Sequence, residues 1–301
     1  MHRRDEPVVA VRRWLRPAVG VAMTAALVAL GVVSGAEKLK PADLVARHLD
    51  AIGTAEAREA LTTYRFTGTV EALIRMAGTV IGSGTNRPTG RALLVSDARR
   101  SRVGMEFGFP DYPSERVAFD GDNVTVTALP GAGRTHLGAF FLSYGGVASS
   151  GLLGGVLSEA WILRQAGWNG AKLDYTGLKK LEGRPVHELR IRPKRDVGGL
   201  QVTCSFEADT FRHVRTVYRE SIAAPMVTDP TRSSSNMDRV VQLTEDFSEF
   251  RAEQGLVLPH VYRLWLRIET NDSIENQWTL TLTGFAFNTP ADPKDFDANL
   301  P

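Results

Sequence analysis

Residues 64–74 read YRFTGTVEALI, and this stretch decides the fold class because apolar and polar side chains alternate along most of it. One set of alternate positions holds Tyr64, Phe66, Val70 and Ile74, and the set between them holds Arg65, Thr67, Thr69 and Glu71. A period of two places successive side chains on opposite faces of a β-strand, so one face meets a core and the other meets water. The stretch therefore predicts a half-buried strand of an antiparallel sheet.

The same alternation returns at short intervals along the chain. Further candidate strands are residues 91–96, 102–107, 115–119, 124–128, 173–181, 186–192, 201–207, 213–219, 239–250, 261–269 and 278–287. Turn residues separate these runs, and Asp120–Asn123 (DGDN) is typical of a tight hairpin. The spacing favours an antiparallel meander over βαβ units.

Before the first strand the period is helical. Residues 44–52 place apolar side chains on one face of a helix that Gly53 ends, and Thr54 can cap a second short helix. The expected fold class is therefore α+β, mainly antiparallel β.

The first 36 residues have the pattern of a secretory signal peptide. Five arginines lie in residues 1–16, residues 18–33 (AVGVAMTAALVALGVV) are apolar, and residues 34–36 (SGA) are small, as a signal peptidase requires. We expect cleavage before Glu37 and an exported protein of the periplasm or cell envelope. The alternative is an uncleaved anchor, and membrane contact is then expected through this leader alone.

The charge of the chain follows from this leader. The whole chain carries a net charge of +2, while the leader's five arginines against Asp5 and Glu6 give +3, so the remainder is near −1. A nucleic-acid partner is therefore not expected.

Residues 137–168 (LGAFFLSYGGVASSGLLGGVLSEAWILRQAGW) interrupt the strand pattern. They are apolar, rich in glycine and poor in charge, which leaves three interpretations: a membrane span, a buried helical pair, or a mobile apolar lid over a cavity. The glycine pairs 145–146 and 154–155 permit the hinge-like backbone angles that a lid needs.

The search for catalytic chemistry finds no motif. The histidines lack metal-ligand spacing, no serine lies in a Gly-x-Ser-x-Gly turn, and no glycine-rich loop leads into a helix to hold phosphate. Cys204, the single cysteine, lies in a predicted strand, where a small buried side chain is the common role. We therefore expect a protein that is not an enzyme, with no cofactor and no metal.

The order of several motifs resembles the LolA/LolB-like periplasmic lipoprotein carriers. The motifs are residues 44–53 (LVARHLDAIG), 64–68 (YRFTG), 119–124 (FDGDNV), 175–177 (YTG), 181–189 (LEGRPVHEL), 206–210 (FEADT), 245–247 (EDF), 255–259 (GLVLP) and 287–296 (FNTPADPKDF). The aromatic residue that usually follows the third motif is absent here. Together the motifs span nearly all of the chain after the leader.

This resemblance implies an open, strongly curved half-barrel sheet with helices covering the concave face. It implies one such domain over residues 37–301, with an apolar helical insert at about 136–168. Phe66 and Val70 are then expected on the inner face, with Phe140, Phe141, Leu142, Leu152, Leu153, Trp161 and Leu163 at the lid. Core packing is the alternative role for each of these residues.

The function expected from the resemblance is that of an exported, non-catalytic binding or carrier protein for a hydrophobic ligand, such as a lipid, an acyl chain or a lipoprotein. The alternative is a structural, sensor or protein-interaction module of the envelope, with a filled core and envelope proteins as partners.

Overall fold

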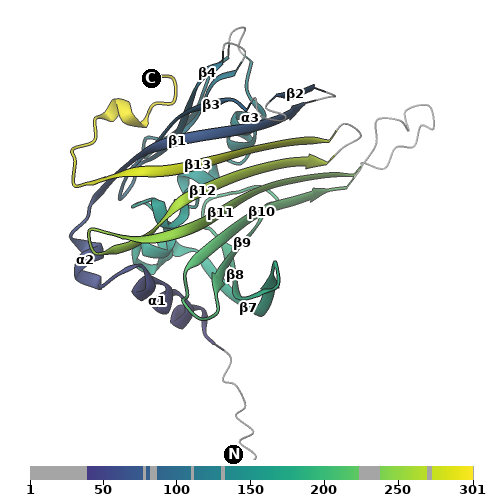
Figure 1. The fold of residues 1–301 in the computed structure, drawn as a ribbon. Helices are drawn as coiled ribbons and strands as arrows, with labels where there is room; N and C mark the ends of the chain where they lie inside the picture. Colours follow the sequence, from purple (N-terminus) through teal and green to yellow (C-terminus); the bar gives the residue numbers. More distant parts are fainter. Residues whose placement is uncertain are drawn as a thin grey trace, which may run out of the picture. The chain divides into compact units, whose positions relative to one another are not determined.

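The structure is a computed structural model that describes residues 39–76, 79–81, 87–109, 112–129, 133–223, 238–269 and 273–300. Within these ranges thirteen strands form one antiparallel sheet (Figure 1). The strands are β1 (Thr63–Met76), β2 (Thr79–Ile81), β3 (Thr89–Asp97), β4 (Ser101–Phe109), β5 (Tyr112–Phe119), β6 (Val124–Val126), β7 (Lys172–Leu181), β8 (Arg184–Arg192), β9 (Gln201–Glu207), β10 (His213–Ile222), β11 (Arg239–Glu253), β12 (Leu256–Glu269) and β13 (Ile274–Phe287). The predicted leader, residues 1–36, lies outside the described residues, so its cleavage stays a prediction.

The first and last long strands lie side by side near the middle of the sheet. The order is β6-β5-β4-β3-β1-β13-β12-β11-β10-β9-β8-β7, with β2 paired to β1 off this path. Tyr64 pairs with Phe287 and Val70 with Leu280, and the register shifts after Thr67. Strands β6 and β7 do not pair with each other, so the sheet is an open half-barrel, which confirms the predicted fold class.

The two faces of the sheet differ as the alternation predicts. In β12, Tyr262, Leu264 and Leu266 are buried, while Arg263 and Trp265 on the opposite face are half-buried. Tyr64, Phe66, Val70 and Ile74 of β1 are each no more than 1% exposed. The buried sets belong to one continuous hydrophobic cluster inside the curve of the sheet.

Two helices precede the first strand, in the part of the sequence that has a helical period. Helix α1 (Pro41–Ile52) buries Leu44, Val45, His48 and Ile52, and it lies against β7 and β12. Helix α2 (Ala55–Glu59) is capped by Thr54, whose side chain accepts the backbone N–H of Ala57 at 3.2 Å.

The chain ends in a tail that returns to the first half of the sheet. The short 3₁₀ turn η6 (Pro293–Phe296) lies against β4, and Arg102 of that strand donates to the carbonyl oxygens of Asp295 and Leu300. These bonds fix the tail across β4.

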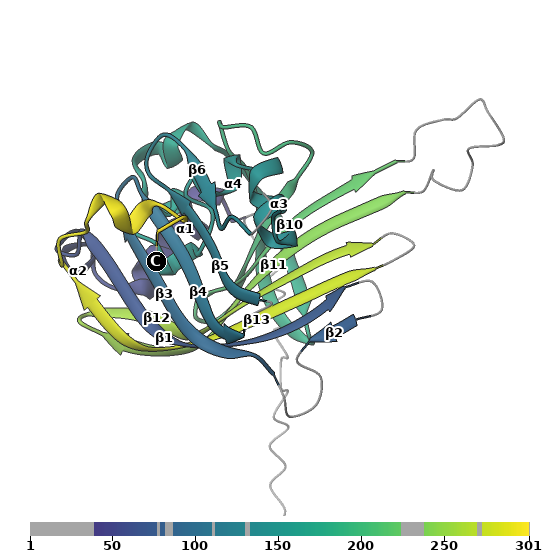
Figure 2. The same ribbon diagram turned by 90° about the horizontal axis from the view of Figure 1, so that it is seen from above.

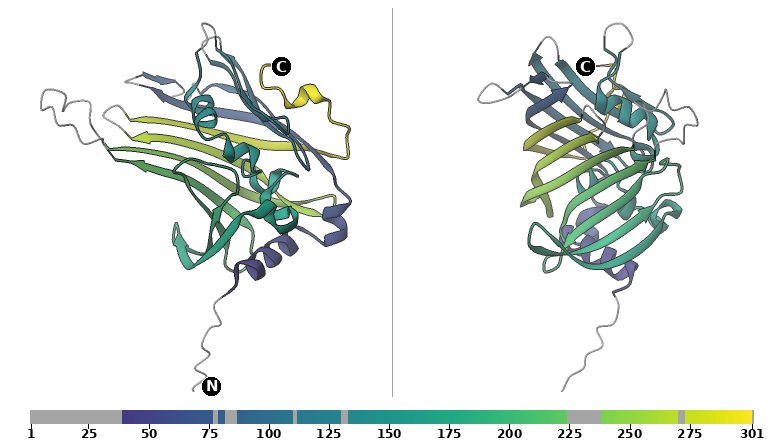
Figure 3. Two further views of the ribbon diagram at one scale, coloured as in Figure 1. Left: turned by 180° about the vertical axis from the view of Figure 1, so that it is seen from behind. Right: turned by 90° about the vertical axis from the view of Figure 1, so that its right-hand side faces the viewer.

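The apolar segment after β6 forms short helical pieces rather than one long helix. They are α3 (His136–Ser143), α4 (Gly146–Ser149), η2 (Gly155–Leu157), η3 (Ile162–Arg164) and η4 (Ala166–Gly170). Figures 2 and 3 show these pieces inside the curve of the sheet. In the part of the chain that the structure describes, no helix has the length and hydropathy to cross a membrane.

Candidate functional site

The segment from 136 to 170, here called the insert, covers the concave face and touches both halves of the sheet. Helices α3 and α4 contact β5, and α3 also contacts β6, while η2 contacts β10 and β12. Because β6 and β7 are the two edges of the open sheet, the insert also connects these edges along the chain. The insert therefore packs against strands of both halves of the sheet.

The structure brings eight of the nine predicted binding residues into one buried cluster. Phe66, Val70, Phe140, Phe141, Leu152, Leu153, Trp161 and Leu163 are each at most 4% exposed and belong to the same hydrophobic core. Leu142 differs, because its side chain is 51% exposed on the outer side of α3. The described side chains fill this interior with one another, and contact with a ligand stays a prediction.

A buried carboxyl group on β11 holds the middle of the insert. Glu245 accepts the backbone N–H of Gly154 at 2.7 Å and the hydroxyl of Tyr218 at 2.6 Å, and it also bonds Tyr262. The Tyr218 hydroxyl lies 3.0 Å from the carbonyl oxygen of Leu152 in the insert. Because Glu245 is fully buried, desolvation raises its pKa to about 7 despite these bonds.

A second buried carboxyl group on β5 holds the beginning of the insert. Thr135 caps α3 by accepting the N–H of Gly138 at 3.0 Å, and its hydroxyl donates to Glu115 at 2.6 Å. Tyr112 donates to the same carboxyl group, and the Trp278 indole donates to the Tyr112 oxygen at 2.9 Å. Burial raises the pKa of Glu115 to about 7.

Both glutamates occupy positions where the strand alternation calls for an apolar side chain. Glu245 falls between Leu243 and Phe247 on the inner face of β11, and Glu115 precedes Val117 in the same way on β5. A carboxylate at an inward-facing position of a strand was therefore a signal in the sequence that could have identified both glutamates.

Two histidines that are far apart in the sequence meet at the third attachment of the insert. Trp161 stacks on His213 with ring centroids 5.0 Å apart, and its edge meets His48 of α1 at 4.9 Å. Burial lowers the pKa of His48 to about 4 and that of His213 well below its usual value, so both rings are neutral at pH 7. Their pairing could not be predicted from the sequence, because it depends on how α1 docks against the sheet.

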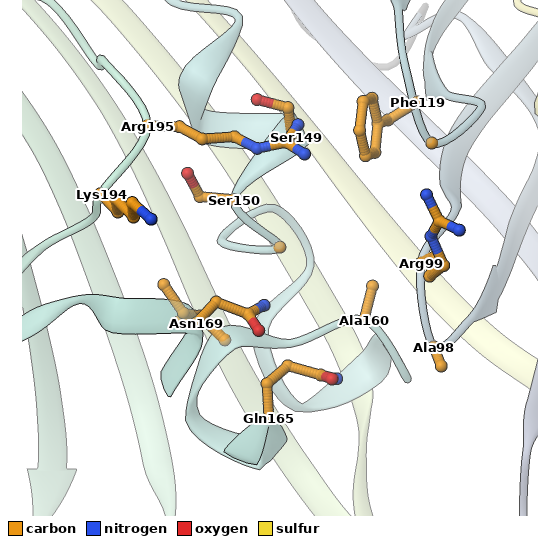
Figure 4. Close-up of a pocket in the computed structure, with 13 residues that line it drawn as sticks. Ala98, Arg99, Phe119, Ser149, Ser150, Ala160, Gln165, Asn169, Lys194 and Arg195 are labelled. Carbon is orange, nitrogen blue, oxygen red and sulfur yellow. The ribbon is translucent and has the colours of Figure 1, made fainter. Parts of the chain in front are cut away.

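A cleft of about 380 Å³ opens beside the insert. It is lined by the β3–β4 turn, the β5–β6 turn, the insert and the loop 193–200 that follows β8. Figure 4 shows Lys194 and Arg195 on one side of it and Arg99 on the opposite side. The Arg195 guanidinium lies 5.2 Å from the centre of the Phe119 ring. We call this feature the basic cleft, because no carboxylate is among its described lining residues.

Two observations bear on metal binding and on thiol chemistry in the described residues. No three His, Cys, Asp or Glu side chains within them come together as metal ligands. Cys204 is buried, and desolvation raises the pKa of its thiol to about 12, which leaves little of the reactive thiolate at pH 7. The candidate site therefore consists of an apolar interior, the insert that covers it and is held by buried hydrogen bonds, and the basic cleft beside the insert.

Comparison with known proteins gives matches to solved structures alone. No protein-family model matches the chain, and no curated protein matches it. A LolA superfamily protein from Nitrosomonas europaea has a TM-score of 0.45 and 11% identity, covering 86% of this chain and 97% of that one. An outer membrane lipoprotein-sorting domain from Vibrio parahaemolyticus has a TM-score of 0.43 and 12% identity, covering 84% and 97%. The resemblance predicted from the sequence is thus matched among solved structures, at TM-scores too low to carry an argument about function.

Proposed function

We propose that this chain is an exported, non-catalytic binding protein for a hydrophobic ligand such as a lipid or an acyl chain. The ligand would lie between the insert and the concave face of the sheet, against Phe66 and Val70 on one side and Leu153 on the other. Localisation in the periplasm or cell envelope rests on the leader-like first 36 residues.

The observation that carries the proposal is how the insert is attached. Its apolar side chains fill the inside of the sheet, yet it forms no strand and consists of helical pieces of three to eight residues. Buried polar bonds centred on Glu245 and Glu115 hold it. An acyl chain that took the place of these apolar side chains would gain about 0.8 kcal/mol for each buried CH₂ group. The insert can therefore serve as a lid that a ligand displaces.

One observation favours a second function, a structural or protein-interaction module of the envelope. Phe141, Leu152 and Trp161 are each at most 1% exposed and pack in one cluster, as a permanently filled core requires. Leu142 and Leu178 are large apolar side chains that remain more than half exposed, and they are candidate contacts for a protein partner.

The two functions differ in what the purified protein carries. The full chain would be expressed with its own leader in a bacterium and recovered without detergent, and its intact mass would report whether the leader is cleaved. Native mass spectrometry and lipid extraction would then identify any bound molecule, and a fluorescent fatty acid would measure uptake.

The matched variants are Leu153→Ala, which enlarges the interior, and Leu142→Ala, which changes an exposed leucine of the insert. A hydrophobic-ligand protein should show a bound mass or saturable uptake that Leu153→Ala alters and Leu142→Ala does not. Absence of bound lipid and of uptake in all three folded proteins, checked by thermal unfolding, would favour the interaction module.

A further inference from the structure

The basic cleft gathers three positively charged side chains from separate segments of the chain. Arg99 comes from the β3–β4 turn, while Lys194 and Arg195 come from the loop after β8, and all three side chains line the cleft. Within the described residues none of the three forms an ion pair with a carboxylate. Segments distant in the sequence therefore place three cations around one hollow.

Three carboxylates that lie close to lining residues along the chain have partners within their own turns. Asp97 pairs with Arg100 at 2.6 Å. Asp120 accepts backbone N–H groups inside its own hairpin turn, at 2.7 and 2.8 Å. Asp196 accepts the N–H of Gly198 at 2.8 Å. These acids stabilise their own turns, and none of them is among the described residues that line the cleft.

Neutral hydrogen-bonding groups complete the lining. Ser150 is 6% exposed, and its hydroxyl oxygen has no hydrogen-bond partner among the described residues. Gln165 and Asn169 add side-chain amides to the lining, below Ser150 in the view of Figure 4. Asn169 reaches this place through a left-handed turn in which Gly167, Trp168 and Asn169 have φ values of 56°, 51° and 51°. A buried hydroxyl without a partner is costly, and a ligand oxygen would remove that cost.

We propose that the basic cleft binds the phosphate group of an anionic ligand. Arginine donors in planar forks match phosphate oxygens, lysine adds a point charge, and Ser150 supplies a short neutral donor. A volume of about 380 Å³ exceeds the needs of a bare phosphate and leaves room for its ester substituent. A lipid headgroup and a free phosphate present the same oxygens. The site rests on its own residues and does not require the hydrophobic ligand proposed above.

The position of the cleft makes the lipid headgroup the more informative probe. Ala160 and Ile162 line the cleft, while Trp161 between them is buried in the core with its ring against His213. A phosphate in the cleft would therefore lie one residue from the apolar interior, where the rest of an amphiphile could continue.

The test is a titration of the full chain, in the form recovered from its bacterial host, by isothermal titration calorimetry. The probes are inorganic phosphate, a short-chain phosphatidic acid below its micelle concentration, and the matching uncharged diacylglycerol. The double variant Arg99→Gln/Arg195→Gln removes two of the three charges. Arg251→Gln, at a side chain 63% exposed outside the cleft, is the matched control.

We expect saturable binding of at least one phosphate-bearing probe, weakened about tenfold or more by the double variant and unchanged by the control. Binding should also weaken as salt rises from 50 to about 500 mM, because the cations are exposed to solvent. If phosphatidic acid binds and inorganic phosphate does not, the ligand of the cleft is a lipid headgroup. If both bind equally well, the ligand is a free phosphate anion. Binding of the uncharged lipid without either phosphate would support the hydrophobic site and overturn the basic cleft.

Ser150 allows a milder test that keeps every charge. Ser150→Ala should weaken phosphate binding severalfold, whereas Ser158→Ala should not. Ser158 is also a buried hydroxyl that has no partner in the part of the chain that the structure describes. No saturable phosphate binding, or equal weakening by both serine variants, would overturn the proposal.

Discussion

Replacement of Glu245 by glutamine should change how stability depends on pH. Burial raises the pKa of this carboxyl from 4.5 to about 7 in the folded protein, and unfolding returns it to its ordinary value. The folded state therefore holds the proton more tightly between these values. The stabilising contribution is complete below pH 4.5 and is lost as the pH rises through 7. At about 1.36 kcal/mol for each tenfold change in proton affinity, the loss is about 3 kcal/mol.

Glutamine keeps the shape of the protonated acid but does not titrate. Its carbonyl oxygen can accept from Gly154 and Tyr262, and its amide can donate to the Tyr218 oxygen. We expect the two proteins to have similar free energies of unfolding near pH 4.5. By pH 8 the variant should be the more stable by about 3 kcal/mol. Urea unfolding followed by tryptophan fluorescence, repeated across this pH range, measures the difference.

Other buried groups titrate between pH 4 and 7, so the test compares the free energies of unfolding of the two proteins at each pH. Glu115 acts in the same direction, because its pKa is also raised to about 7. His48 and His213 act in the opposite direction, because their lowered pKa values make their contribution grow as the pH rises towards 6.5. All three remain in the variant and cancel. A difference that stays flat with pH, or that matches the exposed control Glu249→Gln on the same strand, would refute the reasoning.

Three further changes test how the insert is held. Tyr218→Phe removes the hydroxyl that bonds Glu245 and the insert, and it should lower the free energy of unfolding by about 1–2 kcal/mol and speed proteolysis of the insert. Gly146→Ala should lower the free energy of unfolding by about 1–3 kcal/mol, because the added Cβ would lie 1.8 Å from a backbone oxygen of loop 193–200. Gly145→Ala should leave the free energy of unfolding nearly unchanged, because the nearest atom to its added Cβ is 3.6 Å away. Urea unfolding measures both variants. Phe141→Ala should cost about 3–5 kcal/mol, and Leu142→Ala less than about 1 kcal/mol, by thermal or urea unfolding.

Strands with one buried face could be predicted from the sequence, because the alternation is the direct result of that burial. Residues 201–207 were predicted as a strand with the bounds that β9 has. The prediction for β12 began at Val261, five residues late. The beginning of β12 has no alternation of buried and exposed positions, because three consecutive residues are buried: Leu258, Pro259 and His260. The three residues of β2 are too few to show any period.

The candidate site was only partly predictable, because its parts depend on different kinds of information. The apolar insert was visible in the composition, and its buried side chains follow from that. The basic cleft was not, because Arg99 and Arg195 lie in turns without a period and meet only through the curvature of the sheet. Leu142 was predicted with its neighbours, but a composition argument cannot tell which side of a short helix faces out.

The seam between β1 and β13 has a consequence for how the chain could be divided. Strands β1 to β6 and β7 to β13 form two sequence-continuous halves, and within the sheet their only neighbouring pair in the described residues is β1 with β13. A single backbone cut in the insert would break no strand pairing, since β6 and β7 are not hydrogen-bonded to each other. The molecule thus has the topology of a split protein, whose two fragments could reassemble along a central seam and regain one interior only when both are present.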